Sequence, residues 1–222
     1  MLSFNAKTGE IRIYGEIGEN WFEEGITAAG VSDALDAMDG KRVTVRINSP
    51  GGVADEGIAI YNTLKRYAGG VDTVIDSVAA SAASIIALAG ESRTTLKGSR
   101  WMIHNAMAAG IGNSVEMRKL AEILDVYDAS IAEIYGEYMT QSGDGIRAMM
   151  TAETWFDGAS SLEVGLSTSL EEKAATEPAK VAAWFHNAPK DVSESKIAAA
   201  QLRPQPVARE LARLKLRLNM TK

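Results

Sequence analysis

The stretch from residue 71 to residue 90, VDTVIDSVAASAASIIALAG, constrains the fold of this chain more than any other. Its first part is apolar with alternating character, which predicts a buried strand ending at Asp76-Ser77. Its second part has apolar residues at helical spacing and stops at Gly90. A strand that turns sharply into a small-residue helix directs unpaired N–H groups and the positive end of the helix dipole at the turn. Ser81 lies there and is a candidate nucleophile. The simpler alternative is that Ser81 and its neighbouring serines are helix caps or packing residues.

The composition excludes several kinds of chemistry. The 222 residues include no cysteine, which excludes disulfides, thiolate metal sites and a cysteine nucleophile. Only His104 and His186 could act as histidine bases, and two histidines are too few for a multi-histidine metal centre, so we expect no metal and no cofactor. The net charge of −6 argues against nucleic-acid binding by the core domain. No apolar run could span a bilayer and the N-terminus lacks a signal-peptide pattern, so we expect a cytoplasmic protein with no membrane partner.

Alternating strand and helix patterns predict an α/β core. Period-two alternation predicts strands over residues 10–17 and 43–48, and apolar spacing predicts helices over 23–38 and 55–67. Ser32-Asp33 is a plausible capping point for the first helix.

Two further segments carry candidate chemistry. The loop Asn48-Ser49-Pro50-Gly51-Gly52 can expose backbone N–H groups to an anion or an oxyanion, although a plain tight turn is an equal alternative. A short apolar strand over residues 101–103 ends in His104, 23 residues after Ser81. The two side chains could meet at corresponding strand ends, although a lone histidine in such a place is more often structural.

The longest helical pattern covers residues 114–139. Its apolar stripe is broader than one small core requires, which suggests a helix shared with another subunit. The ordinary alternative is a helix that covers the sheet.

The composition changes after about residue 170, and four of the five prolines lie beyond it. We therefore divide the chain into a domain over 1–170, a linker with partial helix over 171–206, and a basic amphipathic helical tail over 207–222. Such a tail could dock on an acidic partner, nucleic acid or a capsid surface, or it could be a solvated helix without a ligand.

Together these parts suggest a serine hydrolase. In this interpretation His104 takes the proton of Ser81, an acid near Glu153 orients the imidazole, and backbone N–H groups stabilise the tetrahedral oxyanion.

Four motifs resemble those of the ClpP-type serine peptidases in their order and approximate spacing: INSPGG (47–52), AIYN (59–62), SVAASAASIIALAG (77–90) and WMIHN (101–105). The resemblance covers roughly residues 10 to 170 and is closest to the phage- and prophage-encoded branch of head maturation proteases. It implies an α/β fold of the ClpP/crotonase type, a spiral of ββα units with a C-terminal extension. The helix over 114–139 would then be the family's handle. The family assembles as heptameric rings that can stack into a tetradecamer.

The resemblance also implies the site residues. Ser81 would be the nucleophile and His104 the general base, and Gly52 and Ala82 would supply the oxyanion N–H groups. Position matching places Glu153 where the family has an aspartate, a departure from the pattern. Asp157 is the rival third member of the triad.

The function implied is an ATP-independent serine endopeptidase that acts on capsid or scaffold proteins, in the host cytoplasm or inside an assembling phage prohead. The short N-terminal segment argues against a Clp ATPase partner, although a housekeeping-type Clp proteolytic subunit remains an alternative. A crotonase-type acyl-CoA enzyme would need no Ser81/His104 pair. A non-catalytic capsid-assembly scaffold is kept open by the glutamate at position 153.

Overall fold

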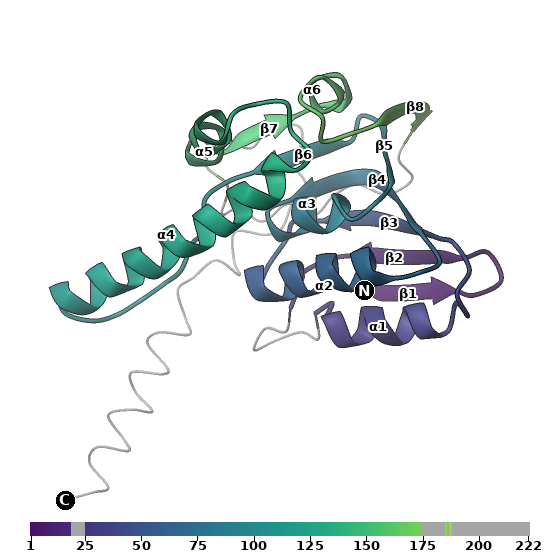
Figure 1. Ribbon diagram of the computed structural model, residues 1–222, viewed down its shortest axis with the longest axis horizontal. Coiled ribbons are helices and arrows are strands. Elements are labelled where there is room, and N and C mark those ends of the chain that lie inside the picture. The colour runs from purple at the N-terminus through teal and green to yellow at the C-terminus, as the bar shows by residue number, and fades with distance from the viewer. Residues whose placement is uncertain (19–24, 175–184, 186, 188–222) are drawn as a thin grey trace, which may run out of the picture.

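The computed structural model describes residues 1–18, 25–174, 185 and 187. Within these residues the chain forms a mixed α/β fold whose elements are shown in Figure 1. The strands are β1 (Leu2–Asn5), β2 (Glu10–Tyr14), β3 (Val43–Ser49), β4 (Val71–Ala80), β5 (Ser92–Lys97), β6 (Arg100–Ile103), β7 (Thr154–Phe156) and β8 (Ser169–Ala174). The helices are α1 (Ala28–Asp36), α2 (Ala54–Arg66), α3 (Ala82–Ala87), α4 (Ser114–Gly136), α5 (Gly143–Thr151) and α6 (Gly158–Glu163).

The strands of this part of the chain form one sheet in the order β1-β2-β3-β4-β5-β8. Along that path β1 and β2 are antiparallel, and every other neighbouring pair is parallel. Strand β6 lies off the path, because it pairs in parallel with the end of β4 and antiparallel with β7. Figure 1 shows α1, α2 and α3 over the same face of the sheet. The predicted α/β core is therefore confirmed.

Strand β4 is longer than its sequence pattern predicts, since it runs to Ala80 and does not end at Asp76-Ser77. Its register against β3 shifts between Ile47 and Ser49, and the buried Asp76 lies at this irregularity. Arg46 donates two hydrogen bonds to the Asp76 carboxylate, one of them 2.8 Å from Nε to Oδ2, and the Tyr14 hydroxyl donates another. Burial, followed by the hydrogen bond to Asp76, raises the pKa of Tyr14 to about 12. Asp76 therefore does not mark the end of the strand; it is one partner of a buried ion pair within it.

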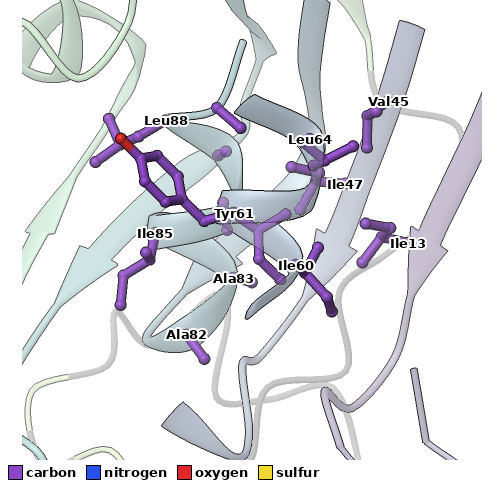
Figure 2. Close-up of a cluster of buried hydrophobic side chains, with 14 of the residues drawn as sticks. Ile13, Val45, Ile47, Ile60, Tyr61, Leu64, Ala82, Ala83, Ile85 and Leu88 are labelled. Atoms are coloured by element: carbon purple, nitrogen blue, oxygen red, sulfur yellow. The ribbon is translucent and has the colours of Figure 1, made fainter. Parts of the chain in front are cut away.

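The core between the sheet and helices α2 and α3 is aliphatic (Figure 2). Ile13, Val45 and Ile47 project from the strands toward Ile60 and Leu64 of α2, and all five side chains are almost fully buried. Each such side chain stabilises the fold by about 1.5–3 kcal/mol relative to an exposed one.

Helix α3 can lie close to α2 because both have small residues at the contact. A Cβ atom added to Gly57 would lie 2.8 Å from the Cβ atom of Ala82, closer than real Cβ atoms approach. The alanine-rich sequence after Ser81 therefore serves packing as well as the turn.

Helix α4 confirms the long helical pattern, and Asn113 and Glu116 form a capping box at its start. Its C-terminal half is buried at Ile131 and Tyr135, whereas Ile123 and Val126 are 53% and 67% exposed. Figure 1 shows this first part of α4 extending away from the body of the fold. None of the helices in the described part of the chain is long and apolar enough to cross a membrane.

The ends of the domain differ from the prediction in several places. Strand β1 was not predicted at all. Helix α1 begins at Ala28 with Thr27 as its N-cap, so the predicted start at residue 23 and the cap at Ser32-Asp33 are wrong; residues 19–24 lie outside the described part. The boundary placed at residue 170 falls within β8, which ends at Ala174. The linker beyond β8, apart from residues 185 and 187, and the tail over 207–222 lie outside the described residues.

The buried ion pair makes a prediction about stability. Asp76→Ala leaves the partly buried Arg46 guanidinium without its partner, and we expect the free energy of unfolding to fall by about 2–3 kcal/mol. Asp72→Ala removes a similar ion pair with Arg42 that is more exposed to solvent, and it should lower the free energy of unfolding by clearly less than Asp76→Ala does. Urea unfolding of both variants at one protein concentration measures the difference. Equal losses of unfolding free energy in the two variants would show that burial does not make the Asp76–Arg46 pair more important for stability.

Candidate active site

Ser81 lies at the turn between β4 and α3 in a strained conformation. Its φ of 53° and ψ of −128° are unusual for a residue with a side chain. The surroundings hold it there: its N–H donates to the Met102 carbonyl at 3.0 Å, and its carbonyl accepts from the N–H of Ser84 at 2.9 Å and from the Ser84 hydroxyl at 2.6 Å. The side chain does not cap α3. This argues against the simpler interpretation of Ser81 as a helix cap.

His104 follows β6 directly, and its Nε2 lies 2.7 Å from Oγ of Ser81. The two residues meet because β4 and β6 are parallel and paired, with Ala80 opposite Met102. Burial lowers the pKa of His104, and the nearby charges of Glu153 and Asp128 only oppose this effect. The imidazole is therefore neutral at pH 7 and can accept the serine proton.

Glu153 is brought to the same site by β7. Strand β7 pairs antiparallel with β6, with Thr154 opposite Ile103, so the residue before β7 lies near the residue after β6. Glu153 is buried, has a φ of 49°, and its charge acts on His104. Its Oε1 accepts from the Trp155 indole N–H at 3.4 Å and from the backbone N–H of Asn187 at 2.6 Å.

Asp157, the rival acid, has a different role in the structure. It is the N-cap of α6, and its carboxylate accepts hydrogen bonds from the hydroxyl and the backbone N–H of Ser160. These bonds lower the pKa of Asp157. Its carboxylate is therefore engaged at the start of α6, whereas the carboxylates whose charges act on His104 are those of Glu153 and Asp128.

The glycine loop packs against the nucleophile. Gly51 has a φ of 93°, and an added Cβ atom would lie 2.7 Å from Cβ of Ser81 and 2.6 Å from the Ala80 carbonyl oxygen. Gly52 has a φ of 149° and an added Cβ would collide with the Ile17 carbonyl. Ile17 holds the loop from its other side, because its N–H donates to Gly51 and its carbonyl accepts from Val53, both at 2.9 Å. Only glycine fits these two positions.

A pocket of about 400 Å³ opens beside Ser81 and His104. Gly52, Ser81, Ala82 and His104 all line it, so the two residues expected to supply oxyanion N–H groups face the same space as the nucleophile and the base. Most of its remaining wall is apolar and comes from α3 and α4: Ile85, Leu120, Ile123, Leu124, Ile131 and Tyr135. The buried Tyr135 hydroxyl is satisfied by the Ser84 hydroxyl at 2.6 Å. The arrangement is suited to binding an apolar side chain next to an activated serine.

The comparisons with known proteins agree with this geometry. Residues 4–173 match the family model described as Clp protease. The chain belongs to the Clp protease family. Subunit 2 of the ATP-dependent Clp protease of Treponema pallidum is 28% identical over 180 residues, which cover 78% of this chain and 87% of that protein. The proteolytic subunit of Bacteroides fragilis is 30% identical over 135 residues.

That alignment with the Bacteroides subunit covers 60% of this chain and 65% of the relative, so the chain matches slightly less than two thirds of the relative's length. Among solved structures, a variant of ClpP1 from Listeria monocytogenes superposes with a TM-score of 0.66 at 25% identity. It covers 76% of this chain and 94% of the other. The ClpP-type fold is thus confirmed.

Sequence reasoning missed several residues that contact the site. Asp128 of α4 accepts the N–H of Ala106 at 2.6 Å and so ties the segment after His104 to the long helix. Ile17 holds the glycine loop, and Phe185 and Asn187 contact His104 and Glu153. None of these residues belongs to a motif, and only the folded chain brings them together.

The glycine loop gives a prediction about reactivity. Gly51→Ala places a methyl group against Ser81 and Ala80, and because displacement of a reacting group by about 1 Å can cost roughly 10²-fold in rate, we expect labelling of Ser81 by a fluorophosphonate to slow by at least that factor. Gly98→Ala is the matched control, since Gly98 also has a positive φ of 83° but nothing lies within 4 Å of an added Cβ. It should cost roughly 1–2 kcal/mol of stability and leave the labelling rate unchanged. Equal labelling rates for the two variants would contradict the close approach at Gly51.

Proposed function

We propose that this chain is a serine endopeptidase that hydrolyses peptide bonds with Ser81, His104 and Glu153. The observation that carries the proposal is the 2.7 Å contact between Ser81 Oγ and His104 Nε2 at an apolar pocket in a Clp protease fold. The names of the relatives support it, because they describe proteolytic subunits.

The chemistry follows from the positions of the groups. Ser81 Oγ attacks the peptide carbonyl carbon while His104 Nε2 takes the hydroxyl proton, and the charge of Glu153 stabilises the imidazolium that results. The N–H groups of Gly52 and Ala82 would receive the oxyanion. His104 then gives its proton to the leaving amine, and a water molecule, deprotonated by His104, hydrolyses the acyl-enzyme. Each step uses groups of the chain itself, so we propose no cofactor, and the hydrolysis itself consumes no ATP.

The pocket indicates the substrate class. Its walls are aliphatic and aromatic beside the nucleophile, so burial of an apolar side chain next to the scissile bond would stabilise the complex. We propose protein substrates cleaved beside apolar residues.

The exposed part of α4 supports assembly into a homo-oligomer. Val115, Ile123 and Val126 would be covered by a second copy of the chain, as expected of the handle helix in a heptameric ring or a stacked tetradecamer. The relatives named by the comparisons are subunits of ATP-dependent Clp proteases, and this favours a role beside an unfoldase in the cytoplasm as the second candidate. Maturation of a phage head stays a prediction from the motif resemblance alone.

Labelling with a fluorophosphonate probe tests the proposed activity. We expect the wild-type chain to be labelled and Ser81→Ala and His104→Ala to lose labelling, because the first lacks the nucleophile and the second its base. Ser77→Ala, which changes a serine within β4, should be labelled at the wild-type rate. A correctly assembled wild-type chain that takes up no label would overturn the proposed activity and favour a scaffolding role.

Substitution of the two candidate acids tests the third member of the triad. Glu153→Gln keeps the shape of the side chain and removes its charge, so the imidazolium loses its stabilising partner and kcat should fall by roughly 10²-fold or more. Asp157→Asn should keep kcat, since Asn also caps a helix well and the stability cost is below about 1 kcal/mol. Hydrolysis of a fluorogenic peptide with an apolar residue before the scissile bond measures both. A larger loss of kcat in Asp157→Asn would reverse the assignment.

A further inference from the structure

Two residues beyond the family domain lie against the proposed catalytic groups. The family match ends at residue 173 and β8 ends at Ala174, yet Phe185 contacts His104 and Asn187 contacts Glu153. Neither contact was expected from the sequence, where both residues fall in a segment interpreted as a linker.

Phe185 covers the imidazole. Its ring meets the His104 ring edge to face, with centroids 5.5 Å apart and planes at 85°, and meets the Trp155 ring at 5.7 Å and 77°. It also packs on a small buried cluster of Val78, Ala80 and Met102, which lies at the paired ends of β4 and β6. Aromatic pairs in this geometry are attractive and directional, so the contact restrains the tilt of the imidazole.

Phe185 is not among the described residues that line the substrate pocket. The ring therefore supports His104 from outside the pocket and leaves the space beside Ser81 open. This favours a role in catalysis over a role in blocking the substrate.

Asn187 contacts both Glu153 and the residue before it. Its backbone N–H donates to Glu153 Oε1 at 2.6 Å, and its side-chain Nδ2 donates to the Ala152 carbonyl at 2.9 Å. Glutamate has three side-chain torsions, and a fixed donor on one oxygen restricts them. The hydrogen bond from the Asn187 side chain to the Ala152 carbonyl holds the Asn187 backbone where its N–H can donate to Glu153.

We propose that Phe185 and Asn187 are positioning residues of the active site, Phe185 fixing and shielding the imidazole of His104 and Asn187 fixing the carboxylate of Glu153. The proposal rests on the proposed peptidase function. It means that two residues beyond the family match, Phe185 and Asn187, take part in the site.

The test uses the full chain and three phenylalanine variants. Phe185→Ala removes the ring, Phe185→Tyr keeps it, and Phe4→Ala removes an exposed phenylalanine of β1 as a control. Without the Phe185 ring the imidazole of His104 is less well oriented, which affects the chemical step more than substrate binding. We therefore expect Phe185→Ala to lower kcat by about tenfold at nearly unchanged KM. Phe185→Tyr and Phe4→Ala should stay near wild type. Thermal stability and oligomer size are recorded for each variant.

The pH profile separates positioning from simple loss of stability. Among the described residues, the charged groups that act on His104 are Glu153 and Asp128, and both remain in every variant. Burial lowers the pKa of His104, so exposing the ring in Phe185→Ala should raise that pKa toward its ordinary value. Activity requires the neutral imidazole, and the acid limb of kcat/KM should therefore move to higher pH in Phe185→Ala and not in Phe185→Tyr.

A second pair of variants isolates the donor to Glu153. Asn187→Pro has no backbone N–H, whereas Asn187→Ala keeps it and loses only the bond to Ala152. We expect Asn187→Pro to have the lower kcat, by about tenfold, with labelling of Ser81 slowed in parallel.

The outcomes are distinct. A Phe185→Ala variant with the wild-type kcat and acid limb would overturn the positioning role while the labelled wild type still supported the peptidase. A higher kcat in that variant would also overturn it, because it would show that the ring obstructs the site. A wild-type chain that is neither active nor labelled would overturn the proposed function, and this proposal with it.

Discussion

The pairing of the last residues of β4 with β6 is the interaction on which the candidate site depends. Strand β4 pairs with β5 along its first part and with β6 along its last part, so one side of the strand serves two neighbours in turn. Because the β4/β6 pair is parallel, Ser81 and His104 follow strands that end side by side, and their side chains meet at 2.7 Å. The antiparallel pairing of β6 with β7 then adds Glu153 from a distant part of the chain. Two short backbone ladders, β4/β6 and β6/β7, thus set the relative positions of the three residues.

Strain is concentrated at the same place. Among the described residues, Asp39, Ser81 and Glu153 are the non-glycine residues with positive φ, and two of them belong to the proposed triad. Such conformations cost about 1–3 kcal/mol each and persist only where the surroundings impose them. The backbone conformation of Ser81 is held by its hydrogen bonds to Met102 and Ser84 and by the close packing of the Gly51 backbone against it. The aliphatic core under α2 and α3 contributes stability that offsets this strain.

Much of the site could be predicted from local pattern. The change from strand to helix pattern marked Ser81. The scarcity of histidine left only His104 and His186 as candidate bases, and the strand over residues 101–103 favoured His104, whose ring the structure places beside Ser81. Strand ends and helix caps were less well predicted. Asp76 resembled the end of a strand because buried charge is rare, and its partner Arg46 is thirty positions away and could not be found by periodicity. The cap of α1 was misplaced because Ser, Asp and Thr are all suitable caps, and packing selected Thr27.

The sequence by itself determined which chemistry is available and which elements form, because composition and hydrophobic period act locally. It supplied one serine at a strand-to-helix turn, a histidine after a strand, glycines where no side chain fits, and a long helix with an apolar stripe. Only the tertiary structure distinguishes the surroundings of Glu153 and Asp157, because the pairing of β7 with β6 puts Glu153 near the imidazole while Asp157 caps α6. Only the tertiary structure brought Phe185 and Asn187 to the site. Contacts between residues far apart in the chain depend on the closure of the whole fold, and no local pattern records them.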